Sequence, residues 1–278
     1  YHGYIKSVDP NALLVGEAWT ANREIARYTG DEVDIAFEFD LAAGILSGVR
    51  ARAHRPISQA MNSTMRNFPP GQYATFLANH DQDRTFTQLD SLDTKAKLAA
   101  TILLTSPGVP FIYYGDEIGM GGSRDQSDAI TEANMRRPMQ WTGAGLGVGF
   151  TEATPWRAPA PDAAERNVAL QTAVSDSLLS HYRDLIHLRN DVAALRIGDW
   201  VQVATSNPQV YAYLRFTADD VVLVLLNLNN DPVSSEDYVL ELEAGPLAGE
   251  ATAVSLFGPA DPAPPTSTLS PEPACSWS

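Results

Sequence analysis

The stretch L-L-V-G-E-A-W at residues 13–19 decides how the rest of the chain is interpreted. Three aliphatic residues run into a glycine, and a single carboxylate, Glu17, then stands beside Trp19. A short and nearly continuous apolar run is typical of a strand that is covered on both faces of a parallel sheet. The stretch therefore predicts a buried parallel strand with an acid at its carboxyl end.

Three more short apolar runs follow, and helix-like stretches lie between them. The clearest helix is predicted over 92–104, where Leu92, Ala96, Ala99 and Leu103 recur at helical spacing. Strands that alternate with helices predict a parallel α/β sheet. The predicted strands are 12–15, 33–39, 73–78 and 109–114.

A long loop rich in glycine and proline is predicted over 117–175, and a helix that starts at Asp176 or Ser177 follows it. A complete (β/α)₈ barrel takes roughly 250 residues and carries its active site at the carboxyl ends of its strands. Residues 1–195 hold only about four strand–helix units. We therefore expect them to form half of such a barrel.

The pattern changes near residue 197. Runs of β-type residues follow one another, with turn residues and no helix between them. Residues 196–278 are therefore predicted to form an antiparallel β-sandwich domain with an irregular tail. Its predicted strands are 209–216, 220–227, 238–243 and 251–256.

Composition excludes several classes of partner. The 278 residues carry a formal charge of −15, which argues against binding to nucleic acid or to an anionic membrane surface. No apolar run is long enough to cross a bilayer. The single cysteine, Cys275, excludes an internal disulfide and a cysteine-based metal cage.

Polar residues follow the predicted strands. Glu17 comes after the first strand, His80 and Asp81 after the third, and Asp116 and Glu117 after the fourth. A carboxylate after a strand often only caps the next helix, but acids and a histidine after successive strands favour an active site.

The residue types suit cleavage of a glycosidic bond. A retaining glycosidase needs one carboxylic acid to protonate the leaving oxygen and a second carboxylate as nucleophile. Trp19 can stack on a sugar ring and is expected to desolvate Glu17, which would favour a general acid. His80 can donate to a sugar hydroxyl, and Asp81 can stabilise the positive charge of the transition state.

Four stretches in the same order carry a resemblance to the α-amylase superfamily of glycoside hydrolases (glycoside hydrolase family 13). G-E-A-W at 16–19 resembles its general-acid region, and F-L-A-N-H-D at 76–81 is similar to the region of its transition-state-stabilising Asp. V-P-F-I-Y-Y-G-D-E-I-G-M at 109–120 resembles the last barrel strand with its loop. M-R-R-P-M-Q-W at 135–141 resembles the segment after that strand in the branch near oligo-1,6-glucosidases, trehalose synthases and related α-amylases.

The resemblance implies Glu17 as acid/base, Asp81 as transition-state stabiliser and His80 as a substrate-binding residue. Arg84 is either a sugar contact, a partner of an acid, or a surface salt bridge. The implied substrate is an α-glucan or a malto- or isomalto-oligosaccharide, and the implied chemistry needs no cofactor. A calcium ion is possible in a longer parent, but Asp125 and Asp128 alone are too few ligands to support one here.

One departure from the family limits the function. The nucleophilic Asp of the family lies in a segment resembling G-F-R-x-D, and no such segment occurs in this sequence. We therefore expect the C-terminal half of a retaining α-glucan hydrolase that is inactive, or nearly so, and poorly stable on its own. Two alternatives stay open: a transglycosylase or isomerase of the trehalose synthase type, and a non-catalytic carbohydrate-binding or interaction module.

Overall fold

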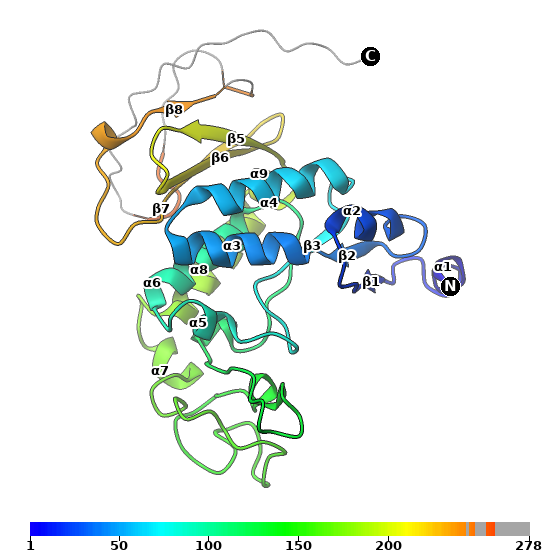
Figure 1. Ribbon diagram of the computed structural model, residues 1–278, viewed down its shortest axis with the longest axis vertical. Helices are drawn as coiled ribbons and strands as arrows, with labels where there is room; N and C mark the ends of the chain where they lie inside the picture. Colours follow the sequence, from blue (N-terminus) through cyan, green and yellow to red (C-terminus); the bar gives the residue numbers. More distant parts are fainter. Residues whose placement is uncertain (243–244, 248–253, 259–278) are drawn as a thin grey trace.

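The structure, a computed structural model, describes residues 1–242, 245–247 and 254–258 (Figure 1). It contains two four-stranded sheets, one parallel with the order β1-β2-β3-β4 and one antiparallel with the order β7-β6-β5-β8. The expected change from parallel to antiparallel pairing along the chain is confirmed.

All strands of the parallel sheet are shorter than predicted. The apolar runs continue past the last paired residue, for example through the buried Phe76, Leu77 and Ala78 after β3. Burial gives a residue its apolar character, whereas a ladder also needs a neighbouring strand in register, so the apolar pattern overestimated strand length. The strands are β1 Val15–Gly16, β2 Ile35–Phe37, β3 Tyr73–Thr75 and β4 Val109–Pro110.

Helices connect the strands in the order expected of α/β units. The helix predicted over 92–104 is confirmed as α6, and the helix expected to start near Ser177 is α8, whose first turn Ser177 caps by accepting from the Ser180 amide at 3.1 Å. The α-helices are α1 His2–Val8, α2 Asn22–Ile25, α3 Phe39–Ala51, α4 His54–Asn67, α5 Thr85–Gln88, α6 Asp93–Thr105, α7 Val168–Thr172, α8 Leu178–Asp191 and α9 Ala193–Ile197. The 3₁₀ turns are η1 Ala26–Tyr28, η2 Asp116–Ile118, η3 Ala133–Arg136 and η4 Ser235–Asp237.

Helices α3 and α4 lie side by side in close contact (Figure 1). Two glycines of α3 allow this approach. A Cβ atom on Gly44 would lie 2.5 Å from Ala60 Cβ, and a Cβ on Gly48 would overlap the Ile57 side chain. The backbones therefore meet where side chains are absent, and Leu41, Ile45 and Ile57 are left to fill the core beside the contact.

The antiparallel sheet begins two residues after α9. Two of its predicted strands, 209–216 and 220–227, are confirmed, whereas the described part of 238–243 forms a strand only at Leu240–Glu241. The strand predicted over 251–256 lies partly outside the described residues, and its described part, 254–256, is not a strand. The described residues form one sheet in this region, so the predicted second layer of a sandwich is not seen in them. Its strands are β5 Asp199–Thr205, β6 Val210–Phe216, β7 Val221–Asn227 and β8 Leu240–Glu241.

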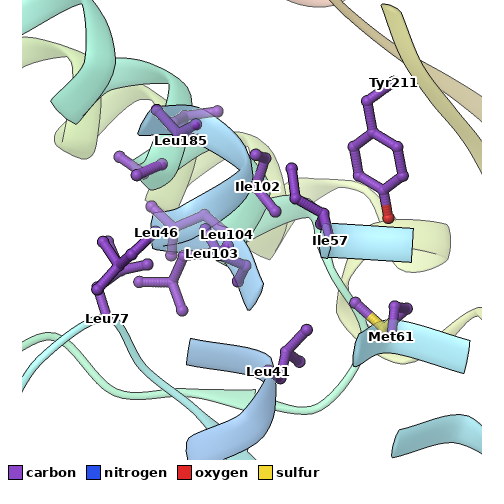
Figure 2. Packing of buried hydrophobic residues seen from close by; sticks show 14 of the residues in the cluster. Leu41, Leu46, Ile57, Met61, Leu77, Ile102, Leu103, Leu104, Leu185 and Tyr211 are labelled. Atoms are coloured by element: carbon purple, nitrogen blue, oxygen red, sulfur yellow. The ribbon is translucent and has the colours of Figure 1, made fainter. Parts of the chain in front are cut away.

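The two sheets share one hydrophobic core. Tyr211 and Tyr213 of β6 belong to the same buried cluster as Ile57 and Met61 of α4, and Figure 2 shows Tyr211 pointing toward that helix. The buried Arg215 adds polar links, because its guanidinium donates to the carbonyl oxygens of Thr105 at 2.7 Å and Gly198 at 2.8 Å. The antiparallel sheet thus shares apolar contacts with α4 and is hydrogen-bonded to the end of α6.

The loop predicted over 117–175 is largely irregular, with only η2, η3 and α7 inside it. Its inner side is nevertheless packed, since Ile118, Met120 and Met139 form a small buried cluster. Within the residues that the structure describes, no helix is long and apolar enough to span a bilayer.

Candidate active site

The predicted site residues follow strands whose carboxyl ends meet at one edge of the parallel sheet. Gly16 of β1 is in register with Ala36 of β2, which pairs in turn with Tyr73 of β3. Glu17 therefore leaves the sheet two strands away from the segment that carries His80 and Asp81. Neighbouring strands lie about 4.8 Å apart, so the strand axes that lead to the two acids are about 10 Å apart.

Glu17 and Trp19 are in direct contact. The indole Nε1–H of Trp19 donates to Oε1 of Glu17 over 3.1 Å, which fixes the carboxylate beside the edge of the ring. Both side chains are nevertheless open to solvent, and Trp19 is 59% exposed. The expectation that Trp19 removes Glu17 from water is therefore wrong for this structure, because the ring meets the carboxylate through its N–H and does not cover it.

Aromatic rings connect Trp19 to the other strands. The ring centroids of Trp19 and Phe39 are 4.2 Å apart, and Phe39 meets Phe76 edge to face with a centroid distance of 5.0 Å. Phe37 then contacts both Phe76, at 5.1 Å, and Phe111, at 4.9 Å. This row of rings runs across the segments that follow or end all four strands, and it gives this edge of the sheet an apolar floor.

His80 and Asp81 are held by two arginines from the long loop. Arg136 donates from Nη2 to Asp81 Oδ1 at 2.7 Å and from Nε to the His80 carbonyl at 3.3 Å. Arg124 donates from Nη2 to the Asp81 carbonyl. His80 Nε2 lies 3.4 Å from the same Asp81 Oδ1. The sequence analysis did not assign a role to either arginine, although Arg136 lies in the M-R-R-P-M-Q-W stretch that carries part of the family resemblance.

Arg84 is buried, so the surface salt bridge considered for it is wrong. Its guanidinium lies over the rings of Tyr113 and Tyr114, with centroid distances of 4.5 and 4.6 Å, and donates to the Tyr114 carbonyl. Its backbone amide also donates to the Gly122 carbonyl at 2.9 Å. Arg84 thus ties the loop after β3 to the loop after β4.

Asp116 and Glu117 belong to the turn η2, and Arg84 lies beside this turn. Burial raises the pKa of Asp116 to about 7, against the opposing effects of Arg84 and of Thr85, whose hydroxyl donates to Asp116 Oδ2 at 3.1 Å. Burial also raises the pKa of Glu117, whose Oε2 accepts from the Gly115 amide at 2.7 Å. Gly115 enters the turn with φ +89, and a Cβ there would press on Met120, so the turn requires glycine. Both acids thus anchor this turn, through the hydrogen bonds from Thr85 and from the Gly115 amide.

The second strand contributes a structural acid. Glu38 is fully buried and caps α3 by accepting from the Leu41 amide, and burial raises its pKa. The neighbouring Asp40 accepts from the Asn22 amide at 3.3 Å. Glu38 is therefore a helix-capping residue, the role that a carboxylate after a strand often has.

The two acids considered as calcium ligands have other partners. Asp125 accepts from Ser127, and Asp128 pairs with Arg157. Across the described residues, no three or more side chains of His, Cys, Asp or Glu gather in a way that could hold a metal ion.

Known proteins support the class to which this fold and these residues point. The family model described as "Alpha amylase, catalytic domain" matches residues 1–198. Alpha-amylase 3 of Dictyoglomus thermophilum is 32% identical over 82% of this chain and 45% of its own length. The trehalose synthase/amylase of Mycobacterium tuberculosis is 30% identical over 83% of this chain and 47% of its own. The crystal structure of an alpha-amylase from H. orenii superposes with a TM-score of 0.73 at 34% identity, covering 83% of this chain and 46% of that one.

These findings define a glycoside hydrolase-like protein. The chain belongs to the alpha-amylase family, glycoside hydrolase family 13. It spans about half the length of the curated relatives that it matches.

Proposed function

We propose that this chain forms the acid/base half of an active site that cleaves α-glucosidic bonds with retention of configuration. The observation that carries the proposal is the meeting, at one edge of the parallel sheet, of Glu17 with Trp19 and of His80 with Asp81. Membership of the α-amylase family supports an α-glucan, or a malto- or isomalto-oligosaccharide, as the substrate.

Each residue has a role in this proposal. Glu17 protonates the glycosidic oxygen as the bond breaks and later removes a proton from the attacking water. Asp81 accepts from sugar hydroxyls and stabilises the oxocarbenium-like charge. His80 donates to a hydroxyl near the cleaved bond, and Trp19 stacks on a sugar ring. Arg84, buried beside Asp116 and Glu117, acts as the partner of these acids and not as a direct sugar contact.

The chain lacks a candidate for the second carboxylate. A retaining enzyme needs a nucleophile that forms a glycosyl ester, and no stretch resembling the family's G-F-R-x-D occurs in the 278 residues. We propose that residues 1–195 form the C-terminal half of a (β/α)₈ barrel, that 196–278 form a separate β domain, and that the chain alone is close to inactive. Loss of a central catalytic group costs several orders of magnitude in rate.

The test is reconstitution. The chain is assayed for release of 4-nitrophenol from 4-nitrophenyl α-maltoside, alone and co-expressed with the part of the H. orenii alpha-amylase that lies outside the match. We expect hydrolysis only in the mixture, and a loss of about a thousandfold or more with Glu17→Gln. The matched control is Glu241→Gln, an exposed acid in β8, which should change nothing.

Two outcomes would contradict the proposal. Hydrolysis by the chain alone that depends on Glu17 would refute the predicted inactivity but support the assigned acid. A mixture that folds, binds maltotetraose and still shows no Glu17-dependent cleavage would refute the hydrolase and favour a binding module.

A second candidate rests on the relationship to the trehalose synthase/amylase. An isomerase of that type would convert maltose into trehalose in the reconstituted mixture. Product analysis after incubation with maltose distinguishes the two activities, since a hydrolase releases only glucose.

A further inference from the structure

We propose that Arg136 is the positioning residue of the candidate transition-state stabiliser: it fixes the Asp81 carboxylate so that one oxygen faces the sugar. This inference rests on the proposed function of Asp81. It follows from the two hydrogen bonds that Arg136 makes to the 80–81 segment, 55 residues away in sequence.

Arg136 is itself rigidly placed. It is the last residue of the 3₁₀ turn η3. Met135, which directly precedes it, is fully buried, and its carbonyl oxygen accepts from the Tyr113 hydroxyl at 3.1 Å. Next along the chain, Arg137 donates to Asn134 and to the carbonyl oxygens of Ala158 and Pro159. The guanidinium therefore extends from a segment anchored on both sides, as a group that orients a reactive carboxylate must.

The geometry divides the work between the two oxygens of Asp81. Arg136 Nη2 and His80 Nε2 both meet Oδ1, at 2.7 and 3.4 Å. Oδ2 is thereby the oxygen turned to accept from a sugar hydroxyl. The second bond, from Arg136 Nε to the His80 carbonyl, ties the backbone to the same guanidinium, so the side chain and its loop are held together.

Orientation, and not stability, is the main effect of this pair. Both side chains are more than a third exposed, and ion pairs between exposed groups add little to stability. A planar guanidinium with two directed donors nevertheless restricts the rotation of a carboxylate, which a single ammonium group cannot do as well.

The test measures sugar binding and loop protection in the full chain. Maltotetraose affinity is determined by calorimetry for wild type, Arg136→Ala, Arg136→Lys, Asp81→Asn and the double variant Arg136→Ala/Asp81→Asn. Amide hydrogen exchange of residues 79–82 is followed in the same proteins without sugar. Arg196→Ala, an exposed arginine of α9 outside the loops that follow the strands, controls for the loss of one positive charge.

We expect Arg136→Ala to weaken binding about tenfold and to accelerate exchange at 79–82, with partial recovery in Arg136→Lys. The double variant should bind no worse than Asp81→Asn, because Arg136 acts through Asp81. Wild-type affinity and wild-type exchange in Arg136→Ala would overturn the inference, and so would additive losses in the double variant. If the wild type binds no sugar at all, the proposed function fails, and the exchange rates still decide whether Arg136 holds the 80–81 segment.

Discussion

The Trp19 indole contacts both Glu17 and Phe39. Its N–H donates to the Glu17 carboxylate at 3.1 Å, and its ring centroid lies 4.2 Å from the centroid of the Phe39 ring. One side chain therefore carries both a polar and an apolar task at the edge of the sheet. The two tasks can be separated by substitution.

Trp19→Phe keeps a ring beside Phe39 and removes the N–H donor, whereas Trp19→Ala removes both. We expect maltotetraose affinity to fall by about threefold in Trp19→Phe and by about tenfold in Trp19→Ala, since loss of aromatic contact adds to loss of the hydrogen bond. Calorimetry measures both values. Equal losses in the two variants would show that the N–H, and not the ring, matters for binding.

Asp116 should make the protein less stable as pH rises. Its pKa in the folded state is about 7, raised by burial from 3.8, so the folded protein retains a proton that the unfolded chain has lost between these values. The unfolding free energy of wild type relative to Asp116→Asn should therefore fall from pH 4 to pH 7 and stay low above it. Asn removes the buried charge, so the variant should be more stable at pH 8 by a few kcal/mol, on the order of magnitude that such a shift implies.

The comparison is made by urea unfolding at several pH values. The exposed Asp219, changed to Asn, is the matched control. A constant stability difference between wild type and Asp116→Asn across this range would show that the buried acid does not change its protonation on folding.

Gly48→Ala should destabilise the protein although alanine favours helices. The new methyl group would overlap Ile57 at the contact of α3 and α4, and forced overpacking costs about 1–3 kcal/mol. Gly3→Ala in α1 is the control, because a Cβ there meets nothing within 4 Å and should stabilise by up to about 1 kcal/mol. Thermal unfolding of the two variants should move in opposite directions, and parallel shifts would contradict the close packing of α3 on α4.

Arg215→Met should be costly even though no acid partners this arginine in the described structure. The guanidinium donates to the carbonyl oxygens of Thr105, Gly198 and Asp199, and methionine would leave the buried Thr105 carbonyl without this donor and remove the two part-buried hydrogen bonds. We expect a loss of about 3 kcal/mol in urea unfolding. Arg196→Met, whose side chain is exposed, should change stability by less than about 0.5 kcal/mol. Similar losses in both would mean that the buried links contribute nothing.

The sequence was informative where a single element decides the outcome. Local apolar periodicity found α6 and α8, and β-branched runs bounded by turn residues found β6 and β7. It failed at β5, whose alternating Val201, Gln202 and Val203 carried a usable but overlooked signal. Strand ends in the parallel sheet could not be predicted, because register depends on neighbours far away in sequence.

The same limit applies to the candidate site. Glu17 and Asp81 follow strands and were identified from that position, but no pattern in the sequence states that Arg136 reaches across to Asp81. Arg84 was identified in N-H-D-Q-D-R, yet its burial between the loops could not be foreseen, because two tyrosines from the other loop cover it. Contacts between loops are set by tertiary packing, which short motifs do not encode.

The links between β6 and α6 limit how this family can be recombined. The hydroxyl groups of Tyr213 and Thr105 share one hydrogen bond of 2.5 Å, and the Arg215 guanidinium donates to the carbonyl oxygen of the same threonine. A graft of the antiparallel sheet from one relative onto the helices of another would separate these partners even if the cut falls cleanly between α9 and β5. Successful hybrids should therefore inherit the end of α6 and the middle of β6 from the same parent.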